Sequence, residues 1–303
     1  MDRAALDTLI VGGGPAGLAA ALVLGRCLRN VLVCDTGTQR NRASRKIHAM
    51  PGQEGRAPSA FLDDVRQELC RYPTIRLLDT EVEHVSPNGG GFDFRCADGM
   101  TGTASTVLFA TGLVDTLPTI PGIETFYGSS VHHCVYCDGA EYEGRPLVAY
   151  GVGYKGAGLA LMLSHWSADV VACCEETAPS AELEKRLADR QIPIITSRVT
   201  ELVGAGPKLE AVIFENGMSH ACNALFFSTG CTQGSKLVDQ LGCLRDERGT
   251  IMTDPLTEET TVHGVYVAGD ASRDVLLVAV AVGEGAKAGV AINRALLKAD
   301  GLL

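Results

Sequence analysis

Short apolar runs alternate with glycine-rich turns and apolar helical stretches along this chain. The first apolar run, residues 8–11, ends in three glycines, and a helical stretch over residues 18–24 leads to a second apolar run at residues 31–34. Continuous apolar runs of this length are typical of strands that are buried on both faces of a parallel sheet. The order strand, turn, helix, strand therefore predicts an α/β fold.

The turn after the first run has the spacing Gly12-x-Gly14-x-x-Gly17, and Asp35 ends the second run. Glycines permit the tight turn and the close approach of backbone to a pyrophosphate, whose charge lies at the helix N-terminus. Asp35 is then placed to accept hydrogen bonds from a ribose hydroxyl. We predict a bound dinucleotide here, in preference to a glycine-rich turn without a ligand.

The same pattern recurs in the middle of the chain. A run at residues 147–150 leads into the turn Gly151-x-Gly153-x-x-Gly156, and a predicted helix and strand follow before Glu175 and Glu176. An internal repeat of this kind indicates two Rossmann-like domains.

Later apolar runs place the second domain inside the first. Runs at 107–112 and 225–230 hold equivalent places in the two copies, and a strand near 265–270 with a helix over 279–298 completes the first copy. Proline and glycine residues lie at the two points where the chain passes from one domain to the other. We predict a discontinuous first domain (residues 1–116 and 245–303) and an inserted second domain (residues 117–244).

The composition indicates which classes of partner and which cellular compartment to expect. The chain has 303 residues, 46% hydrophobic content and a net charge of −10, and its basic residues do not cluster, which argues against a nucleic-acid partner. The apolar stretch at residues 16–24 is too short to span a bilayer, and we expect no signal peptide. Most of the eleven cysteines lie singly in apolar surroundings, so we expect a reducing cytoplasm and no membrane partner.

The most informative motif is Cys134-Val135-Tyr136-Cys137, which lies between the two glycine-rich turns. Thiol–disulfide exchange needs one thiolate that attacks and a second thiol that resolves the mixed disulfide. His132 and His133 precede the motif and can lower the pKa of Cys134 or carry protons, and Asp138 follows it.

Other interpretations of this motif stay open. A zinc site built from the two histidines and two cysteines is disfavoured because the sequence offers no second ligand cluster, so we predict no metal. The histidines can equally be surface residues of a strand, and Asp138 can be a turn residue before Gly139.

Together these motifs resemble the low-molecular-weight thioredoxin reductases, a family of FAD-dependent disulfide oxidoreductases, along essentially the whole chain. The resembling pieces, in order, are the first glycine-rich turn, residues 50–52, 110–112 and 134–139, the second turn, and residues 268–270. Residues 41–44 with His48, and the run 55–62, are more similar to the branch that contains dithiol oxidases and atypical reductases.

The resemblance implies a homodimer with FAD in the first domain. It implies that Cys137 faces the flavin, that Cys134 meets the external thiol or disulfide, and that Asp138 is an acid/base. We add His133 as a catalytic candidate. The cofactor contacts that the family resemblance implies are Gly12, Gly14, Pro15, Ala16, Gly17, Asp35, Thr36, Arg40, Asn41, Ala43, His48, Val82, Ala110, Thr111, Gly112, Gly269, Asp270, Val278 and Ala279.

The second domain departs from the family. The family's His-Arg-Arg clamp for the 2′-phosphate of NADPH falls on Cys174-Glu175-Glu176, and like charge makes NADPH a doubtful cofactor. Either Glu175 holds the ribose of NADH, or the fold no longer binds a nicotinamide and Tyr154 or Lys155 fills the pocket. At the flavin end, Leu276-Leu277-Val278 replaces the family's Arg-Gln-Ala.

The leading hypothesis is an FAD enzyme that exchanges two electrons with its Cys134–Cys137 pair without NADPH. A thioredoxin-like protein or a small dithiol or disulfide is the expected substrate, and oxygen, ferredoxin or a flavodoxin-like protein is the expected electron partner. The alternatives are a thioredoxin-disulfide reductase driven by NADH or NADPH, and a flavin-binding redox sensor with negligible turnover.

Overall fold

The structure is a computed structural model that describes residues 6–175, 177–247, 249–272 and 275–303. The chain forms two compact units. Unit 1 comprises residues 1–42, 50–114 and 233–303, and unit 2 comprises residues 43–49 and 115–232. Unit 2 is therefore inserted into unit 1, and the predicted α/β fold with one Rossmann-like domain inside the other is confirmed.

The boundaries of the units differ in detail from those expected. The sequence placed the return crossing at residues 244/245, whereas the structure places it at 232/233. The reason is α6 (Leu237–Gln240), whose Leu237 and Val238 are buried in the core of unit 1. Residues 43–49 belong to unit 2 by their contacts, although they lie inside the segment expected to form the first domain.

Unit 1 is built on a sheet with the strand order β3-β2-β1-β6, in which β17 also pairs with β6. All of these pairs are parallel, while β4 and β5 extend the sheet as an antiparallel meander. The strands are β1 (Leu6–Val11), β2 (Val31–Asp35), β3 (Ile75–Asp79), β4 (Val82–Asn88), β5 (Gly91–Cys96), β6 (Thr101–Phe109) and β17 (Val265–Val267).

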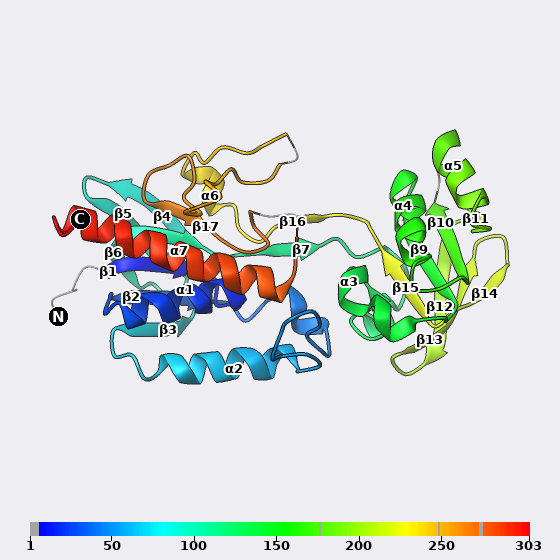
Figure 1. The fold of residues 1–303 in the computed structure, drawn as a ribbon, viewed down its shortest axis with the longest axis horizontal. Helices are drawn as coiled ribbons and strands as arrows, with labels where there is room; N and C mark the ends of the chain where they lie inside the picture. The colour runs from blue at the N-terminus through cyan, green and yellow to red at the C-terminus, as the bar shows by residue number, and fades with distance from the viewer. Residues whose placement is uncertain (1–5, 176, 248, 273–274) are drawn as a thin grey trace. The chain divides into compact units, whose positions relative to one another are not determined.

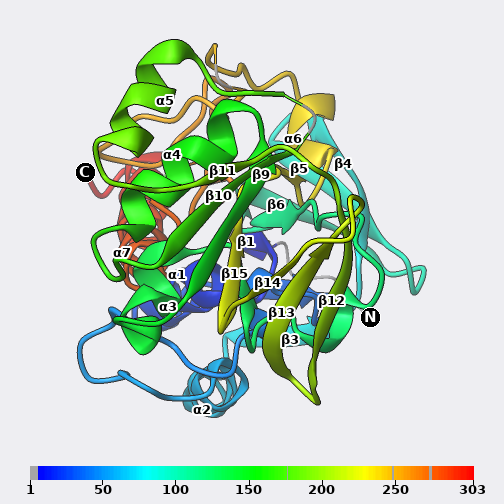
Figure 2. The same ribbon diagram turned by 90° about the vertical axis from the view of Figure 1, so that its right-hand side faces the viewer.

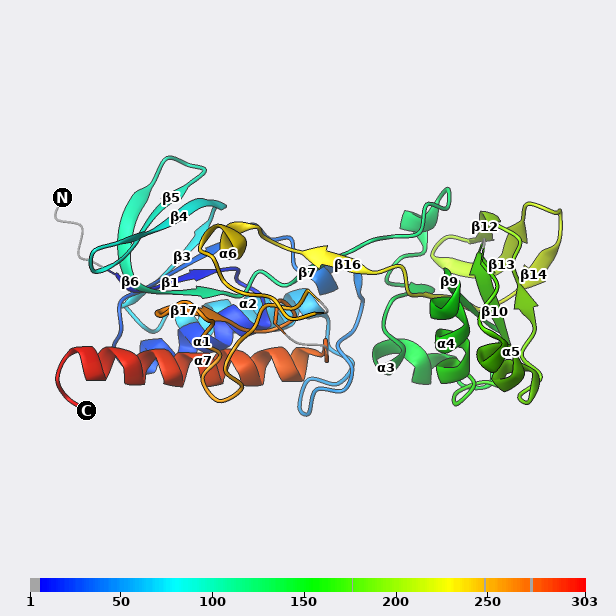
Figure 3. The same cartoon turned by 90° about the horizontal axis from the view of Figure 1, so that it is seen from above.

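Helices cover one face of the parallel strands, and the β4–β5 end of the sheet turns over the other face. Helices α1 (Pro15–Arg26) and α7 (Val278–Ala299) lie side by side on one face, and β4 and β5 lie on the other (Figures 1 and 3). The close packing of α7 on α1 requires Gly285, because a Cβ there would lie 2.0 Å from the Ala16 carbonyl oxygen. Helix α2 (Pro58–Leu69) also contacts α1.

Unit 2 repeats the plan with a parallel sheet of order β11-β10-β9-β15-β8. Its strands are β8 (Val131–His132), β9 (Leu147–Val152), β10 (Val170–Glu175), β11 (Ile194–Ile195) and β15 (Ala224–Phe227). Figure 2 shows this sheet between the helices α4 (Tyr154–Leu163) and α5 (Ala181–Ala188) and the meander of β12 (Val199–Ala205), β13 (Lys208–Phe214) and β14 (Ser219–Ala221).

The two layers of unit 2 follow from the alternation of side chains along β9. Leu147 and Ala149 pack in the cluster that contains α4, whereas Val148 and Tyr150 pack in the cluster that contains β12 and β13. Successive side chains of a strand point to opposite faces, so a continuous apolar run supplies both cores. This alternation places the Tyr150 ring beneath the meander.

Short elements complete the chain. They are η1 (Arg40–Ala43), β7 (Leu113–Asp115), η2 (Ile123–Thr125), α3 (Val135–Asp138), η3 (Gly139–Tyr142) and β16 (Cys231–Gln233). Strands β7 and β16, where the chain leaves unit 1 and returns to it, pair with each other. None of the helices in the described ranges combines the length and apolar character needed to cross a membrane.

Candidate active site

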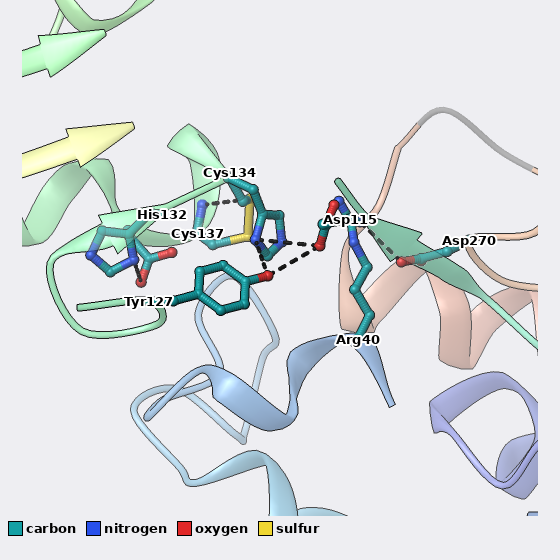
Figure 4. Close-up of a disulfide and its surroundings, with 9 residues drawn as sticks. Arg40, Asp115, Tyr127, His132, Cys134, Cys137 and Asp270 are labelled. Carbon is teal, nitrogen blue, oxygen red and sulfur yellow. Dashed lines mark hydrogen bonds and ion pairs between the residues drawn. A yellow bond between two sulfur atoms is a disulfide. The ribbon is translucent and has the colours of Figure 1, made fainter. Parts of the chain in front are cut away.

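The two cysteines of the central motif form a disulfide, Cys134–Cys137, in unit 2 (Figure 4). Cys134 precedes α3 and Cys137 lies within it, so one helical turn holds the two sulfurs together. The backbone N–H of Cys137 donates to Cys134 Sγ at 3.1 Å, which favours negative charge on that sulfur when the disulfide opens. The other nine cysteines are free thiols.

His132 connects the motif to two neighbouring side chains. It is 5% exposed, its Nδ1 lies 3.3 Å from Asp138 Oδ1, and its Nε2 lies 3.2 Å from the Tyr142 hydroxyl. The Tyr142 hydroxyl donates to the Ser129 carbonyl at 2.7 Å. His132 is therefore a buried member of a hydrogen-bond chain, and of the two interpretations left open for it, the surface residue does not fit the structure.

His133 belongs to a second network, whose other members, Tyr127 and Asp115, precede it in the sequence. The Tyr127 hydroxyl lies 3.2 Å from His133 Nδ1 and donates to Asp115 Oδ2 at 3.2 Å (Figure 4). His133 Nδ1 is also 3.6 Å from Asp115 Oδ2. The three side chains thus form one hydrogen-bonded group in front of Cys134.

Burial sets the protonation of several groups in unit 2. Desolvation, with a contribution from the nearby Asp138 charge, raises the pKa of Tyr142 to about 12, so this hydroxyl keeps its proton at neutral pH. Burial also raises the pKa of Cys222 to about 12, and desolvation with the Glu175 charge does the same for Cys173. These thiols are inert, in contrast to the CxxC pair.

In unit 1 the first glycine-rich turn has the backbone that a dinucleotide site needs. Gly12 has φ +108°, and a Cβ on it would lie 2.3 Å from the Ala110 carbonyl oxygen. A Cβ on Gly17 would lie 1.9 Å from the Gly12 carbonyl oxygen. Gly14 precedes α1 without capping it through a side chain, so the first amides of this helix are available to a phosphate.

Asp35 lies at the end of β2, directly beside this turn. It is 7% exposed, and both of its side-chain partners, Gln39 at 2.7 Å and Arg66, meet the same oxygen, Oδ2. Its Oδ1 is thereby left for a ribose hydroxyl. Gly13 must be a glycine here, because a Cβ would lie 2.8 Å from the Asp35 carboxyl group.

One orphaned polar atom fits the binding of FAD by unit 1. The Thr111 hydroxyl is buried and makes no hydrogen bond in the described structure, and Thr111 stands between Ala110 and Gly112 after β6. A buried hydroxyl without a partner costs about 1–3 kcal/mol, and a cofactor hydroxyl or phosphate oxygen would remove that cost. The residues present therefore fit the cofactor that the motifs imply.

A further segment of unit 1 carries Gly269 and Asp270. Arg40 Nη1 lies 3.2 Å from Asp270 Oδ2, so two expected cofactor contacts are brought together (Figure 4). Glu284, on α7, is 7% exposed and accepts a hydrogen bond from the Gly269 N–H at 2.8 Å. Sequence reasoning missed Glu284, because nothing in the helical pattern shows that a carboxylate turns inward to hold a glycine with φ +79°.

The remaining expected cofactor contacts divide between the units. Thr36, Asn41, Val82, Val278 and Ala279 lie in unit 1, with Val278 and Ala279 in the first turn of α7. Ala43 and His48 belong to unit 2, where His48 Nε2 lies 3.6 Å from Glu141 Oε1. Asp115, Tyr127 and Tyr142 were not singled out from the sequence, since each becomes a site residue only through a contact made by the fold.

The second glycine-rich turn keeps its glycines but uses its acidic residue differently. Glu175 accepts a hydrogen bond from the Tyr150 hydroxyl on Oε2 and one from the Val199 N–H on Oε1 at 3.1 Å. Tyr154 is 68% exposed and fills no pocket, whereas Lys155 Nζ comes within 3.9 Å of the Cβ position of Gly230. Glu176 lies outside the described residues.

No metal centre accompanies these groups in the part of the chain that the structure describes. Within that part, no group of three or more His, Cys, Asp and Glu side chains is arranged to hold a metal ion. The sulfurs of Cys134 and Cys137 are bonded to each other.

Comparison with known proteins agrees with the geometry. The family model for pyridine nucleotide-disulphide oxidoreductases matches residues 6–285. Thioredoxin reductase tcpT of Claviceps purpurea is 30% identical over 96% of this chain and 94% of its own length. The crystal structure of HlmI matches with a TM-score of 0.92 and 32% identity over 98% of this chain and 94% of that one.

A bacterial structure gives the same result. The putative thioredoxin reductase TrxB from Bacillus anthracis has a TM-score of 0.91 at 28% identity, with 97% of this chain and 99% of that chain covered. The resemblance drawn from the motifs is confirmed. The chain belongs to the pyridine nucleotide-disulphide oxidoreductase family, in its low-molecular-weight thioredoxin-reductase-like branch of FAD-dependent oxidoreductases.

Proposed function

We propose that this protein exchanges two electrons between an external dithiol or disulfide and FAD through Cys134–Cys137, and that NADPH is not its electron donor. The observation that carries the second part is the engagement of Glu175, whose two carboxylate oxygens are both bound within unit 2. We further propose a homodimer in a reducing cytoplasm, which is consistent with nine free thiols.

The position of Glu175 argues against each nicotinamide cofactor for a different reason. A 2′-phosphate on NADPH would meet a carboxylate instead of the family's arginines, and like charges at 4 Å repel by ~1 kcal/mol even in bulk water. A ribose 2′-OH on NADH would have to share a carboxylate oxygen that already accepts from Tyr150 or from the Val199 amide.

The chemistry that the disulfide supports is thiol–disulfide exchange. A thiolate of the substrate attacks Cys134 Sγ, the bond between Cys134 and Cys137 breaks, and the electron pair of that bond goes to Cys137 Sγ. The second thiolate of the substrate then attacks the mixed disulfide and leaves both cysteines reduced. FAD, when bound, supplies the acceptor or donor of this electron pair.

The partner follows from the same chemistry. Relatives of this chain are named thioredoxin reductases, which supports a thioredoxin-like protein as substrate, and a small dithiol or disulfide is the alternative. With no nicotinamide, the second partner is oxygen in the direction of thiol oxidation. In the direction of disulfide reduction it is ferredoxin or a flavodoxin-like protein.

The test is anaerobic stopped-flow mixing of the purified holoprotein with NADPH, NADH or dithiothreitol, with the flavin absorbance as readout. We expect rapid bleaching by the dithiol and none by micromolar NADPH or NADH. Rapid bleaching by NADPH at that concentration contradicts the proposal, and bleaching by NADH alone identifies an NADH-driven reductase.

Cys134→Ser is the matched variant for the pair. We expect it to lose reduction by the dithiol while it retains its flavin. If Cys134→Ser keeps full activity with every thiol substrate, the electrons do not pass through the pair, and the redox-sensor alternative gains support.

A further inference from the structure

Glu284 is an acidic side chain at a place where acidic residues are rare. It lies in α7 and is 7% exposed, and its Oε2 accepts a hydrogen bond from the Gly269 N–H at 2.8 Å. A polar side chain loses its hydration when it is buried, so a folded protein retains it there when it makes compensating hydrogen bonds. The bond to Gly269 supplies such a compensation, and it connects α7 to the turn that begins at Gly269.

This turn comprises residues 269–272 and follows the point where β17 stops pairing with β6. The Ala268 N–H still donates to the Phe109 carbonyl, at 3.1 Å. Gly269 then takes φ +79°, and its carbonyl accepts a hydrogen bond from the N–H three residues later, at 3.0 Å. The Gly269 N–H therefore leaves the strand ladder, and Glu284 provides its acceptor.

The 269–272 turn is packed closely against α1 and α7. A Cβ on Gly269 would lie 3.0 Å from the Ala16 Cβ, and a Cβ on Gly285 would lie 2.0 Å from the Ala16 carbonyl oxygen. Because Gly285 follows Glu284 on α7, the packing of the two helices fixes the backbone from which the Glu284 side chain reaches the turn. Ala16 lies in the first turn of α1, whose amides are available to a phosphate.

The second residue of the 269–272 turn is held separately. Arg40 Nη1 lies 3.2 Å from Asp270 Oδ2, and these two side chains are 14% and 19% exposed (Figure 4). Gly269 and Asp270 are both expected cofactor contacts, so the turn has to present two neighbouring residues to one ligand. Its conformation is fixed at Gly269 by the bond to Glu284 and at Asp270 by the ion pair.

We propose that Glu284 is a positioning residue for FAD, which holds the 269–272 turn in the conformation that receives the cofactor. Glu284 acts through the Gly269 N–H and needs no contact with FAD itself. This inference goes beyond the proposed function, because it depends neither on the thiol substrate nor on the electron donor.

The consequence for affinity follows from the cost of a buried N–H without an acceptor. When the Glu284 side chain is removed, the Gly269 N–H stays unsatisfied unless the 269–272 turn opens to water. FAD then binds only the fraction of molecules whose turn is closed, and the apparent dissociation constant rises by the inverse of that fraction. A closed fraction of about 1–10% weakens FAD binding by about 10- to 100-fold.

The first test compares Glu284→Ala with Glu284→Gln. The holoprotein is diluted stepwise, and the fluorescence of released FAD gives the dissociation constant. We expect Glu284→Ala to bind FAD about 10- to 100-fold more weakly. Glu284→Gln has a side chain of the same length whose amide oxygen can accept from the Gly269 N–H, so it should keep the wild-type affinity. Equal weakening in both variants, or none in Glu284→Ala, overturns the inference.

Glu258→Ala is the matched control, because Glu258 is a second buried glutamate of unit 1. It is 0% exposed and pairs with Lys287, away from the Gly269 N–H. Breaking this buried pair should lower the temperature of thermal unfolding and leave FAD affinity unchanged. If Glu258→Ala loses as much FAD affinity as Glu284→Ala, a general loss of stability accounts for both, and the positioning role is rejected.

A second measurement does not require any variant to fold. Hydrogen exchange of the wild-type holoprotein in excess FAD is followed by mass spectrometry on fragments of residues 265–272. The Gly269 N–H should exchange as slowly as the Val267 N–H, which donates to the Glu258 carbonyl at 3.0 Å. In Glu284→Ala with saturating FAD, we expect exchange at Gly269 to become about 10-fold faster or more, with Val267 unchanged. Rapid exchange at Gly269 in the wild type contradicts the inference.

Discussion

The two nucleotide-binding halves of this chain share a backbone plan but differ in what their acidic residue does. In unit 1, Asp35 ends β2 with both partners on one oxygen, beside a turn that leaves the buried Thr111 hydroxyl without a partner. In unit 2, Glu175 ends β10 with both oxygens bound by its own domain. In unit 1 one carboxylate oxygen and one buried hydroxyl have no partner among the described residues, whereas in unit 2 each oxygen of the carboxylate already accepts a hydrogen bond.

The difference shows that the glycines and the acid carry separate information. Gly17 and Gly156 are both required by close backbone packing, because a Cβ at Gly17 would lie 1.9 Å from the Gly12 carbonyl oxygen and one at Gly156 would lie 2.5 Å from the Cys173 carbonyl oxygen. Such glycines are needed for the strand and helix to pack whether or not a cofactor binds. The acidic residue at the end of the second strand is not needed for this packing. We therefore use the hydrogen-bond partners of Asp35 and Glu175 to judge whether each turn binds a cofactor.

The largest effect we expect comes from adding one methyl group to each turn. Gly17→Ala drives a Cβ into the backbone that carries the pyrophosphate, so we expect the flavin content of the purified protein to fall about 10-fold or more. Gly156→Ala strains unit 2 by about 1–3 kcal/mol but keeps the flavin. The measurements are the ratio of flavin to protein absorbance and thermal unfolding.

Loss of flavin from both glycine variants would contradict the comparison, because it would show that the second turn also supports the cofactor. Leu28→Ala, at a side chain that is 79% exposed, is the control for handling losses. It should retain both its flavin and its stability.

The acids themselves give the next largest effect. Asp35→Asn removes the charge from a hydrogen bond to the ribose, which is worth about 1.5–3 kcal/mol, so we expect FAD to bind about 10- to 100-fold more weakly. Glu175→Gln leaves FAD affinity unchanged and also leaves reduction by NADH unchanged. Fluorescence titration of the apoprotein and stopped-flow mixing check the two parts. Slower reduction by NADH in Glu175→Gln would restore the NADH interpretation.

The sequence predicted the architecture well, because the order of strands and helices follows from the spacing of apolar residues and glycines along the chain. The continuous apolar runs and the glycine spacing are enough to identify β1, α1, β2 and β9, α4, β10, and the insertion of one copy into the other follows from their order. The boundary at residue 232 was missed, since whether residues 233–244 pack on unit 1 depends on a short helix with only two buried side chains.

The candidate site was predictable only in its covalent parts. The CxxC motif identified the disulfide, because the two cysteines are close in sequence. The partners of His132 and His133 lie on other elements, and no local pattern shows that Tyr142 donates to Ser129 or that Tyr127 reaches Asp115. Likewise, the sequence singles out Glu175 as an acidic residue at a strand end. It does not show that the Tyr150 hydroxyl donates to this carboxylate, because that depends on the face of the sheet to which the Tyr150 side chain points.

A smaller effect tests how firmly unit 2 holds Glu175. Tyr150→Phe removes the hydroxyl that donates to Oε2 and leaves a carboxylate that is only partly solvated, so we expect unfolding to become easier by about 2 kcal/mol. Tyr154→Phe, at a ring that is 68% exposed, is the matched control and should change nothing. Urea unfolding measures both, and equal stabilities would show that Glu175 is not locked in place.

The smallest effect we expect concerns Cys173 in unit 2. This buried thiol should make the free energy of unfolding decrease at alkaline pH. Burial, together with the Glu175 charge, raises the pKa of this thiol from 9.0 to about 12. The folded state therefore holds a proton that the unfolded chain releases, so this contribution is complete below pH 9 and is lost as the pH rises toward 12. Cys173→Ala removes the contribution, so between pH 9 and 10 its unfolding free energy should fall by about 1 kcal/mol less than that of the wild type. Urea unfolding of both proteins at these two pH values makes the comparison. Parallel pH dependences would mean that the strand before Glu175 is more open to water than its burial indicates.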